Sequence, residues 1–274
     1  MLNQQKLKHL QECELIIAKE IKRICDNYGI KYFMVGGTLL GAIRHQGFIP
    51  WDDDIDFGME RSEYEKFCKI CKTDLKEEFV LQTWNTDENY PFSFGKIRLR
   101  GTSVQESFAP RDEENNGIFV DIFPYDNVPD DEKARRRHAY AYFLYKRMLW
   151  TKKGYGKNIK KEGFIKCIKY KVFNWAVSIL SYNKIKDKFS KVLNQYNDNN
   201  TKKLVFDGIY SYEKNSIERL WMSSVREYQF EDTMFMSFED YDGYLRHMFN
   251  NYMQLPPEKD RHNHDILDVD FGKY

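Results

Sequence analysis

Long apolar runs are absent from this 274-residue chain. No stretch of eighteen apolar residues occurs, so we expect no membrane-spanning helix. The first residues lack the apolar segment of a secretory signal, so secretion is not expected either. Neither sign of charge prevails, because 43 lysines and arginines face 42 aspartates and glutamates. This balance identifies no class of partner and argues against pure nucleic-acid binding.

Cysteine is also scarce. The five cysteines are an odd number with no paired spacing, which indicates reduced thiols and a cytoplasmic location. Cys68 and Cys71 have the spacing of a zinc or redox pair. No second Cys or His pair accompanies them at usable spacing, and both lie in a helical pattern. We therefore favour a structural role for these two thiols.

What the chain does contain is enough apolar material, 42% of its residues, to build a sizeable core. Apolar residues in the segment 4–28 recur at helical spacing between charged residues, which predicts an amphipathic helix that ends at Gly29. Ser62 and Glu65 have the spacing of a capping box and predict the start of another helix. A short helix is expected over 39–44. The expected strands cover residues 32–35, 54–59, 79–84, 94–100 and 118–123.

These elements predict an α+β fold, a mixed sheet flanked by helices, over residues 1–128. Residues 129–200 are expected to be helical and basic. Their lysines are concentrated between residues 158 and 191, where only Glu162 and Asp187 oppose them. Residues 201–274 return to mixed character and are expected to complete the site.

Two glycines and a threonine, Gly36-Gly37-Thr38, join the first expected strand to a helix start. Glycine lets the backbone approach a phosphate closely, and a helix N-terminus offers N–H groups to an anion. About ten residues later Asp54 and Asp56 enter the next expected strand.

Alternation along that strand predicts that Asp54 and Asp56 share one face, with Ile55 in the core and Asp53 facing away. Carboxylates crowded in this way suit Mg²⁺ or Mn²⁺. A run of aspartates is more often a solvated loop. Here, however, flanking apolar residues draw the run inward, where unpaired carboxylates are costly.

A third carboxylate, Asp121, interrupts the apolar strand expected over 118–123. A carboxylate in such a run is either functional or paired with a basic residue. Lys96 and Arg98 are the candidate partners. If Asp121 is functional, it would complete a phosphoryl-transfer site with Asp54 and Asp56.

At this point the sequence resembles a known family. The motifs GGTLLGAIRH and GFIPWDDDID resemble the signature of the LicD family, which contains bacterial phosphocholine transferases and is similar to the fukutin group of ribitol-phosphate transferases. The segments Lys96-Ile97-Arg98 and 120–124 and the Pro-Pro-Glu-Lys…His ending follow in the family's order. The resemblance covers nearly the whole chain. It implies a polymerase-β-like nucleotidyltransferase fold.

The resemblance also implies transfer of a phospho-alcohol, phosphocholine first, from a CDP-linked donor such as CDP-choline to a glycan hydroxyl. The acceptor would be a teichoic acid, capsule or lipopolysaccharide precursor, which can be lipid-linked. Asp54, Asp56 and Asp121 would bind Mg²⁺ (or Mn²⁺), and Asp121 would also help to deprotonate the acceptor. The expected donor and phosphate contacts are Gly36, Gly37, Thr38, Arg44, Lys96, Arg98, Lys259 and His264. Arg44, Lys96 and Arg98 are about as well explained by pairing at the rim of the core.

Two other interpretations stay open. The same aspartates would serve a nucleotidyltransferase that moves NMP from an NTP. Alternatively, the lysines of residues 152–191, interleaved with Phe164, Val172 and Trp175, would let a non-catalytic protein bind anionic lipid. As an accessory feature, this stretch would place an enzyme at the inner face of the cell membrane. The commoner explanation of such a stretch is a solvated helical face.

Overall fold

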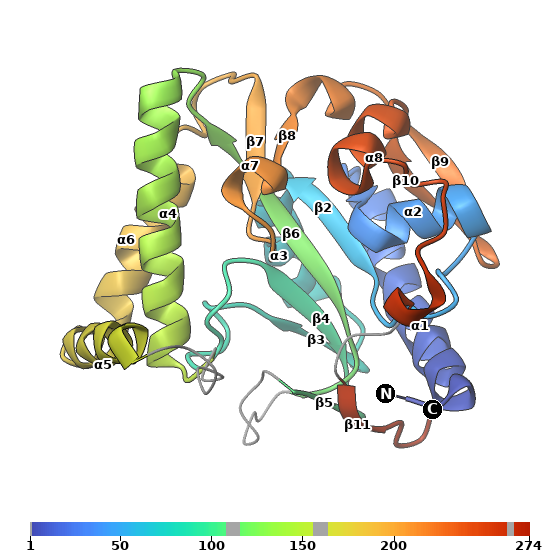
Figure 1. Cartoon of the computed structure of the whole chain (residues 1–274). Coiled ribbons are helices and arrows are strands. Elements are labelled where there is room, and N and C mark those ends of the chain that lie inside the picture. Colours follow the sequence, from blue (N-terminus) through green and yellow to red (C-terminus); the bar gives the residue numbers. More distant parts are fainter. Residues whose placement is uncertain (1, 108–115, 156–163, 262–265) are drawn as a thin grey trace.

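The computed structural model describes residues 2–107, 116–155, 164–261 and 266–274. A mixed sheet has the strand order β1-β2-β6-β4-β3 (Figure 1). These strands cover Phe33–Met34, Asp56–Glu60, Phe119–Val128, Gly95–Leu99 and Phe79–Gln82, respectively. Strands β2 and β6 are parallel, and the other neighbours are antiparallel. The predicted α+β class with a mixed sheet flanked by helices is confirmed.

Strand β6 is longer than the sequence predicted, and it pairs with two further strands besides β2. Its first half pairs with β4, and its second half pairs with β7 (Lys203–Phe206), which in turn pairs with β8 (Ser216–Glu218). The C-terminal third of the chain therefore extends the same sheet as the N-terminal part. The domain limits at residues 128 and 200 stay a prediction. Two further ribbons pair β9 (Val225–Phe230) with β10 (Thr233–Phe238) and β5 (Ser103–Glu106) with β11 (Ile266–Asp270).

The helix predicted over 4–28 is confirmed as α1 (Gln4–Tyr28). Asn3 caps its start by accepting the Lys6 N–H, and Gly29 ends it in the left-handed conformation at φ 58°. The buried stripe of α1 packs into the main core. Helix α2 (Gly36–His45) begins three residues earlier than predicted, directly at the two glycines.

Helix α3 (Arg61–Asp74) corrects one prediction. Its N-cap is Glu60, whose side chain makes no cap hydrogen bond, so Ser62 and Glu65 do not form the predicted capping box. The reason is that strand β2 ends at Glu60 and the helix follows in the next residue. Ser62 therefore lies inside the first turn of the helix and not at the cap position.

Between residues 129 and 200, the described part of the chain is largely helical, as predicted. Helices α4 (Glu132–Lys152), α5 (Phe164–Ser178) and α6 (Tyr182–Asn194) stand together beside the sheet (Figure 1). They share a second apolar core that includes Tyr142, Leu149 and Phe189. Within the described ranges, no helix combines the length and the apolarity needed to cross a bilayer. The remaining helical elements are α7 (Tyr212–Asn215), α8 (Tyr241–Phe249) and the 3₁₀ turns η1 (Arg219–Met222) and η2 (Glu258–Asp260).

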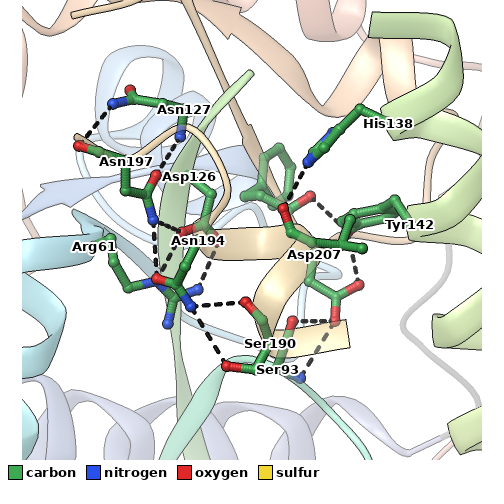
Figure 2. Close-up of polar contacts among 12 residues, drawn as sticks. Arg61, Ser93, Asp126, Asn127, His138, Tyr142, Ser190, Asn194, Asn197 and Asp207 are labelled. Carbon is green, nitrogen blue, oxygen red and sulfur yellow. Dashed lines mark hydrogen bonds and ion pairs between the residues drawn. The ribbon is translucent and has the colours of Figure 1, made fainter. Parts of the chain in front are cut away.

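Buried polar contacts tie these helices to the sheet (Figure 2). Arg61 at the start of α3 binds both carboxylate oxygens of Asp126 on β6, at 2.7 and 2.6 Å. Asp207, directly after β7, accepts hydrogen bonds from Ser93 and Tyr142. The ring of His138 on α4 contacts the Tyr212 hydroxyl and the Val192 carbonyl. Polar side chains thus fix α3 and α4 against the sheet and α6 against α4.

His138 predicts a specific loss of stability in acid. Burial lowers the pKa of His138 below its ordinary value of 6.5, because the charged ring would lose water. Below pH 6.5 the unfolded chain therefore binds a proton that the folded chain resists, and stability falls as the pH falls. We expect the urea midpoint to drop between pH 7.5 and about pH 5.5. The drop should be smaller in His138→Gln, and an equal drop in both proteins would contradict this account.

Candidate active site

Three charged side chains lie side by side across the middle of the sheet. The parallel register of β2 and β6 places Asp56 beside Asp121, and the antiparallel register of β6 and β4 places Lys96 beside Asp121. Register partners on neighbouring strands project from the same face, and neighbouring strands lie about 4.8 Å apart. The Nζ atom of Lys96 is 3.1 Å from Oδ1 of Asp121. The sheet thus brings Asp56 and Asp121 together and adds a lysine to them.

The acidic loop before β2 differs from its prediction. Asp52, Asp53, Asp54 and Asp56 all line one cavity, whereas strand alternation predicted that Asp53 faces away. That prediction was wrong because the strand begins only at Asp56, so the alternation does not apply to the preceding residues. Ile55 is fully buried, as predicted.

The glycines at the start of α2 make room for these carboxylates. Gly36 has a φ of 55°, which favours glycine, and a Cβ there would lie 3.3 Å from Oδ2 of Asp56. A Cβ on Gly37 would lie 2.5 Å from Oδ2 of Asp52. Both glycines line the cavity. Thr38 is buried one residue further on, and its hydroxyl accepts the Asp56 N–H at 2.8 Å. Thr38 therefore fixes the strand that carries Asp56.

The cavity has a volume of about 500 Å³. Its walls come from α1, α2, the acidic loop, β4, β5, β6, α4, α8, β11 and the segment after β7. Asp54, Asp56 and Asp121 all line it, as does Lys96. Residues from most of the length of the chain thus converge on one space.

Several charged residues of this cavity were not predicted from the sequence. Glu14 on α1 is 3% exposed, and its Oε2 has no hydrogen-bond partner among the described residues. Burial, followed by repulsion from Asp54 and the neighbouring aspartates, raises the pKa of Glu14 well above its usual range. Its position between Leu10 and Ile17 on the apolar stripe of α1 was an available signal. Glu106, Lys146 and Asp207 also line the cavity, and nothing local in the sequence indicated them.

Burial and the neighbouring Lys96 have opposite effects on the pKa of Asp121. Burial raises the pKa of Asp121 to about 6, while the charge of Lys96 acts in the opposite direction. The carboxyl group is therefore closer to neutrality than an exposed aspartate. Of the two partners considered from sequence, Lys96 forms the ion pair.

The remaining predicted donor contacts lie elsewhere. Arg98 is buried, donates to Gln82 Oε1 and to the Gly117 carbonyl, and does not itself line the cavity. Arg44 donates to the Tyr252 carbonyl at 2.7 Å and likewise does not line it. Lys259 is exposed in η2. His264 lies outside the described residues. Arg44, Arg98 and Lys259 therefore do not line the cavity.

A preformed metal cage is not present in the parts of the chain that the structure describes, where no three Asp, Glu, His or Cys side chains are arranged to hold an ion. The donor set nevertheless suits Mg²⁺, which typically takes one or two carboxylates and completes its shell with substrate phosphates and water. Asp54 and Asp56, crowded beside further carboxylates, fit an ion that enters together with a phosphate-bearing donor.

Comparison with known proteins relates this chain to phosphotransferases and identifies a nucleotidyltransferase domain in it. Residues 29–152 match the sequence model of the LicD/FKTN/FKRP nucleotidyltransferase domain. The chain is 28% identical over 253 residues to the lipopolysaccharide cholinephosphotransferase LicD of Haemophilus influenzae. The aligned region covers 90% of this chain and 91% of that protein. A 42-residue segment is 43% identical to human ribitol 5-phosphate transferase FKRP, covering 15% of this chain and 8% of that protein.

Gly37→Ala tests the close approach of the glycine turn to the acidic loop. The new methyl group would force the Asp52 carboxylate to shift, because only 2.5 Å separates them. We expect turnover to fall by about tenfold to a hundredfold with little loss of melting temperature, since a small displacement at a reacting centre has effects of this size.

Gly41→Ala in the same helix is the matched comparison. Its Cβ would lie 2.4 Å from the backbone carbonyl of Gly47, so it should lower the melting temperature instead. Rates of donor turnover and thermal unfolding of both variants check the distinction. Equal loss of stability in the two variants would contradict a specific role for Gly37.

Proposed function

We propose that this enzyme transfers phosphocholine from a CDP-linked donor to a hydroxyl of a cell-surface glycan, with Mg²⁺ bound at Asp54 and Asp56. The observation that carries the proposal is the row of Asp56, Asp121 and Lys96 in a cavity walled by further carboxylates. Similarity to a lipopolysaccharide cholinephosphotransferase along 90% of the chain supports the choice of phosphocholine and of a glycan acceptor.

Mg²⁺ would neutralise the donor diphosphate and stabilise the charge that develops on the leaving CMP. Asp54 and Asp56 would hold the ion, with Asp121 close enough in the sheet register to share it. Gly37, at the N-terminus of α2, would seat a phosphate through its backbone N–H, whereas the N–H of Gly36 already donates to the Tyr244 hydroxyl at 2.9 Å. Lys96 lies beside Asp121 and would interact with the transferred phosphate.

Asp121 would orient the acceptor hydroxyl and take its proton as the oxygen attacks phosphorus. A carboxylate with a pKa near 6 is a better base than an ordinary aspartate and is still largely ionised at neutral pH. The P–O bond to CMP breaks as the new P–O bond forms, and CMP leaves. Direct displacement is favoured because sequence reasoning suggests no Ser-His-Asp set or thiolate nucleophile.

A donor screen tests this function. Purified protein is incubated with Mg²⁺, a glycan acceptor and CDP-choline, CDP-ribitol or CDP-glycerol, and both CMP and the phosphate-bridged product are measured by mass spectrometry. We expect product from CDP-choline. Product from the other donors alone would keep the reaction class and discard choline. A requirement for an NTP with release of pyrophosphate would establish the nucleotidyltransferase alternative.

We also propose that α5 contacts an anionic membrane at the inner face of the cell, where lipid-linked glycan precursors are assembled. Val172 and Trp175 on α5, and Ile179 directly after its end, are more than half exposed, and exposed Lys171 lies beside Val172. Apolar and basic residues on one helix suit a surface that offers both acyl chains and negative charge.

Vesicle sedimentation tests this contact. Protein should bind vesicles that contain anionic lipid and should be released as salt rises, because the screening length is about 10 Å at 0.1 M salt. Trp175→Ala combined with Ile179→Ala should weaken binding further. Absence of binding at low salt would leave a solvated helical face as the explanation.

A further inference from the structure

Much of the cavity wall outside the acidic loop is aromatic. Phe92 is the centre of this wall, with ring centroids 5.0 Å from Phe94, 5.7 Å from Trp150 and 5.1 Å from Tyr155. Phe94 in turn contacts Phe123 at 4.6 Å. All five rings line the same cavity as Asp54 and Asp56. A ligand seated on the carboxylates can therefore extend over a continuous aromatic surface.

The charge of the cavity selects a positive ligand. Carboxylates on its wall outnumber lysines by eight to two among the described residues. Each lysine is already paired with an aspartate: Lys96 with Asp121 at 3.1 Å and Lys146 with Asp207 at 2.6 Å. The surplus negative charge attracts cations, and a metal ion bound at the acidic loop accounts for only part of it.

The aromatic wall restricts which cation can occupy it. An ammonium group with N–H donors needs hydrogen-bond acceptors, as Lys146 finds in Asp207, and the ring faces themselves offer none. The hydroxyls of a polyol would likewise lack partners on the ring faces. A quaternary ammonium has no N–H to satisfy and is attracted to the faces of aromatic rings. Lys146 Nζ already lies 4.8 Å from the centroid of Trp150, which shows that this ring accepts a positive charge.

From these contacts we propose that Phe92, Trp150 and Tyr155 form the binding subsite for the trimethylammonium group of the donor. This subsite rests on the proposed function and explains how the enzyme would choose phosphocholine over a polyol phosphate. The indole Nε1 of Trp150 is buried without a hydrogen-bond partner among the described residues. A donor oxygen beside the choline carbon chain would satisfy it.

Direct binding measurements on the full chain test the subsite. Titration calorimetry compares CDP-choline with CDP-glycerol, in the presence of Mg²⁺, for the wild type, Trp150→Leu and Trp150→Phe. In Trp150→Leu we expect the affinity for CDP-choline to fall by about threefold to thirtyfold while that for CDP-glycerol changes by less than about twofold. Trp150→Phe keeps a ring and should lie between the two. Tyr140→Leu, at an exposed position of α4 outside the cavity wall, is the control and should behave as the wild type.

Phe92→Leu provides a second, independent variant, and thermal unfolding shows whether each variant is folded. Equal weakening of both donors in folded variants, or no weakening of CDP-choline, would overturn the subsite. A wild type that transfers phosphocholine alongside such a result would keep the proposed function. Conversely, ring-dependent preference for CDP-choline without any transfer would uphold the subsite and refute the proposed function.

Discussion

Asp56→Asn is expected to reduce turnover by about a thousandfold or more, which corresponds to about 4 kcal/mol of transition-state stabilisation. The amide keeps the size of the side chain but removes the negative charge that would hold Mg²⁺ against the donor phosphates. Asp54→Asn should have a similar effect. The measurement is the rate of CMP release at saturating donor and Mg²⁺.

The fold should survive this substitution. Burial, followed by repulsion from Asp54, Asp56 and the aspartates beside them, raises the pKa of Glu14, so neutralising one of these aspartates relieves unfavourable charge. The contact that fixes the strand is made by the backbone N–H of Asp56 to the Thr38 hydroxyl, and it does not depend on the carboxylate. The thermal unfolding temperature of Asp56→Asn should therefore equal or exceed that of the wild type.

Asp232→Asn is the matched control, since Asp232 is an exposed carboxylate paired with Lys19 outside the cavity. It should turn over donor at the wild-type rate. Exhaustive chelation of the wild type should reproduce the loss seen in Asp56→Asn, and added Mg²⁺ or Mn²⁺ should restore activity only in the wild type. Full activity in Asp56→Asn or after chelation would refute the metal role.

Strand alternation is a local property, so the sequence could predict which faces of their strands carry Asp56 and Asp121. That these residues form the active site stays a prediction. Asp56 and Asp121 each interrupt an apolar strand, and the alternation of a strand fixes the face of its side chains. The same reasoning failed for Asp53, because the start of β2 is set by its pairing with β6 and not by the run of aspartates. The capping box at Ser62 failed for a similar reason, since β2 leads directly into α3.

The rest of the cavity depends on tertiary packing. Lys146 and Asp207 are 61 residues apart and meet only because α4 packs beside the segment after β7. Neither position carries a local signal that separates it from a surface charge. Arg98 shows the converse case, since its motif suggested donor contact, whereas in the fold it bonds to Gln82 and the Gly117 carbonyl. Cations are hard to assign from sequence because their long side chains reach several neighbours.

Arg61→Met is expected to lower the free energy of unfolding by about 3–5 kcal/mol, a large part of the stability of a typical domain. The guanidinium group binds Asp126 through two short hydrogen bonds, and the side chains are only 11% and 2% exposed (Figure 2). Without the arginine, the Asp126 carboxylate stays buried, and among the described side chains Asn197 donates to it at 2.8 Å. Urea unfolding followed by circular dichroism measures the loss.

The cost should come from the uncompensated charge and not from the missing contact itself. Adding Asp126→Leu to Arg61→Met removes that charge, so the double variant should recover much of the stability lost by the single one. Arg136→Met breaks an exposed pair with Glu132 on α4 and should leave the unfolding free energy nearly unchanged. If Arg61→Met cost no more than Arg136→Met, the Arg61–Asp126 pair would not hold α3 to β6. Because β6 also carries Asp121, five residues before Asp126, loss of this pair should loosen the strand on which the active site is built.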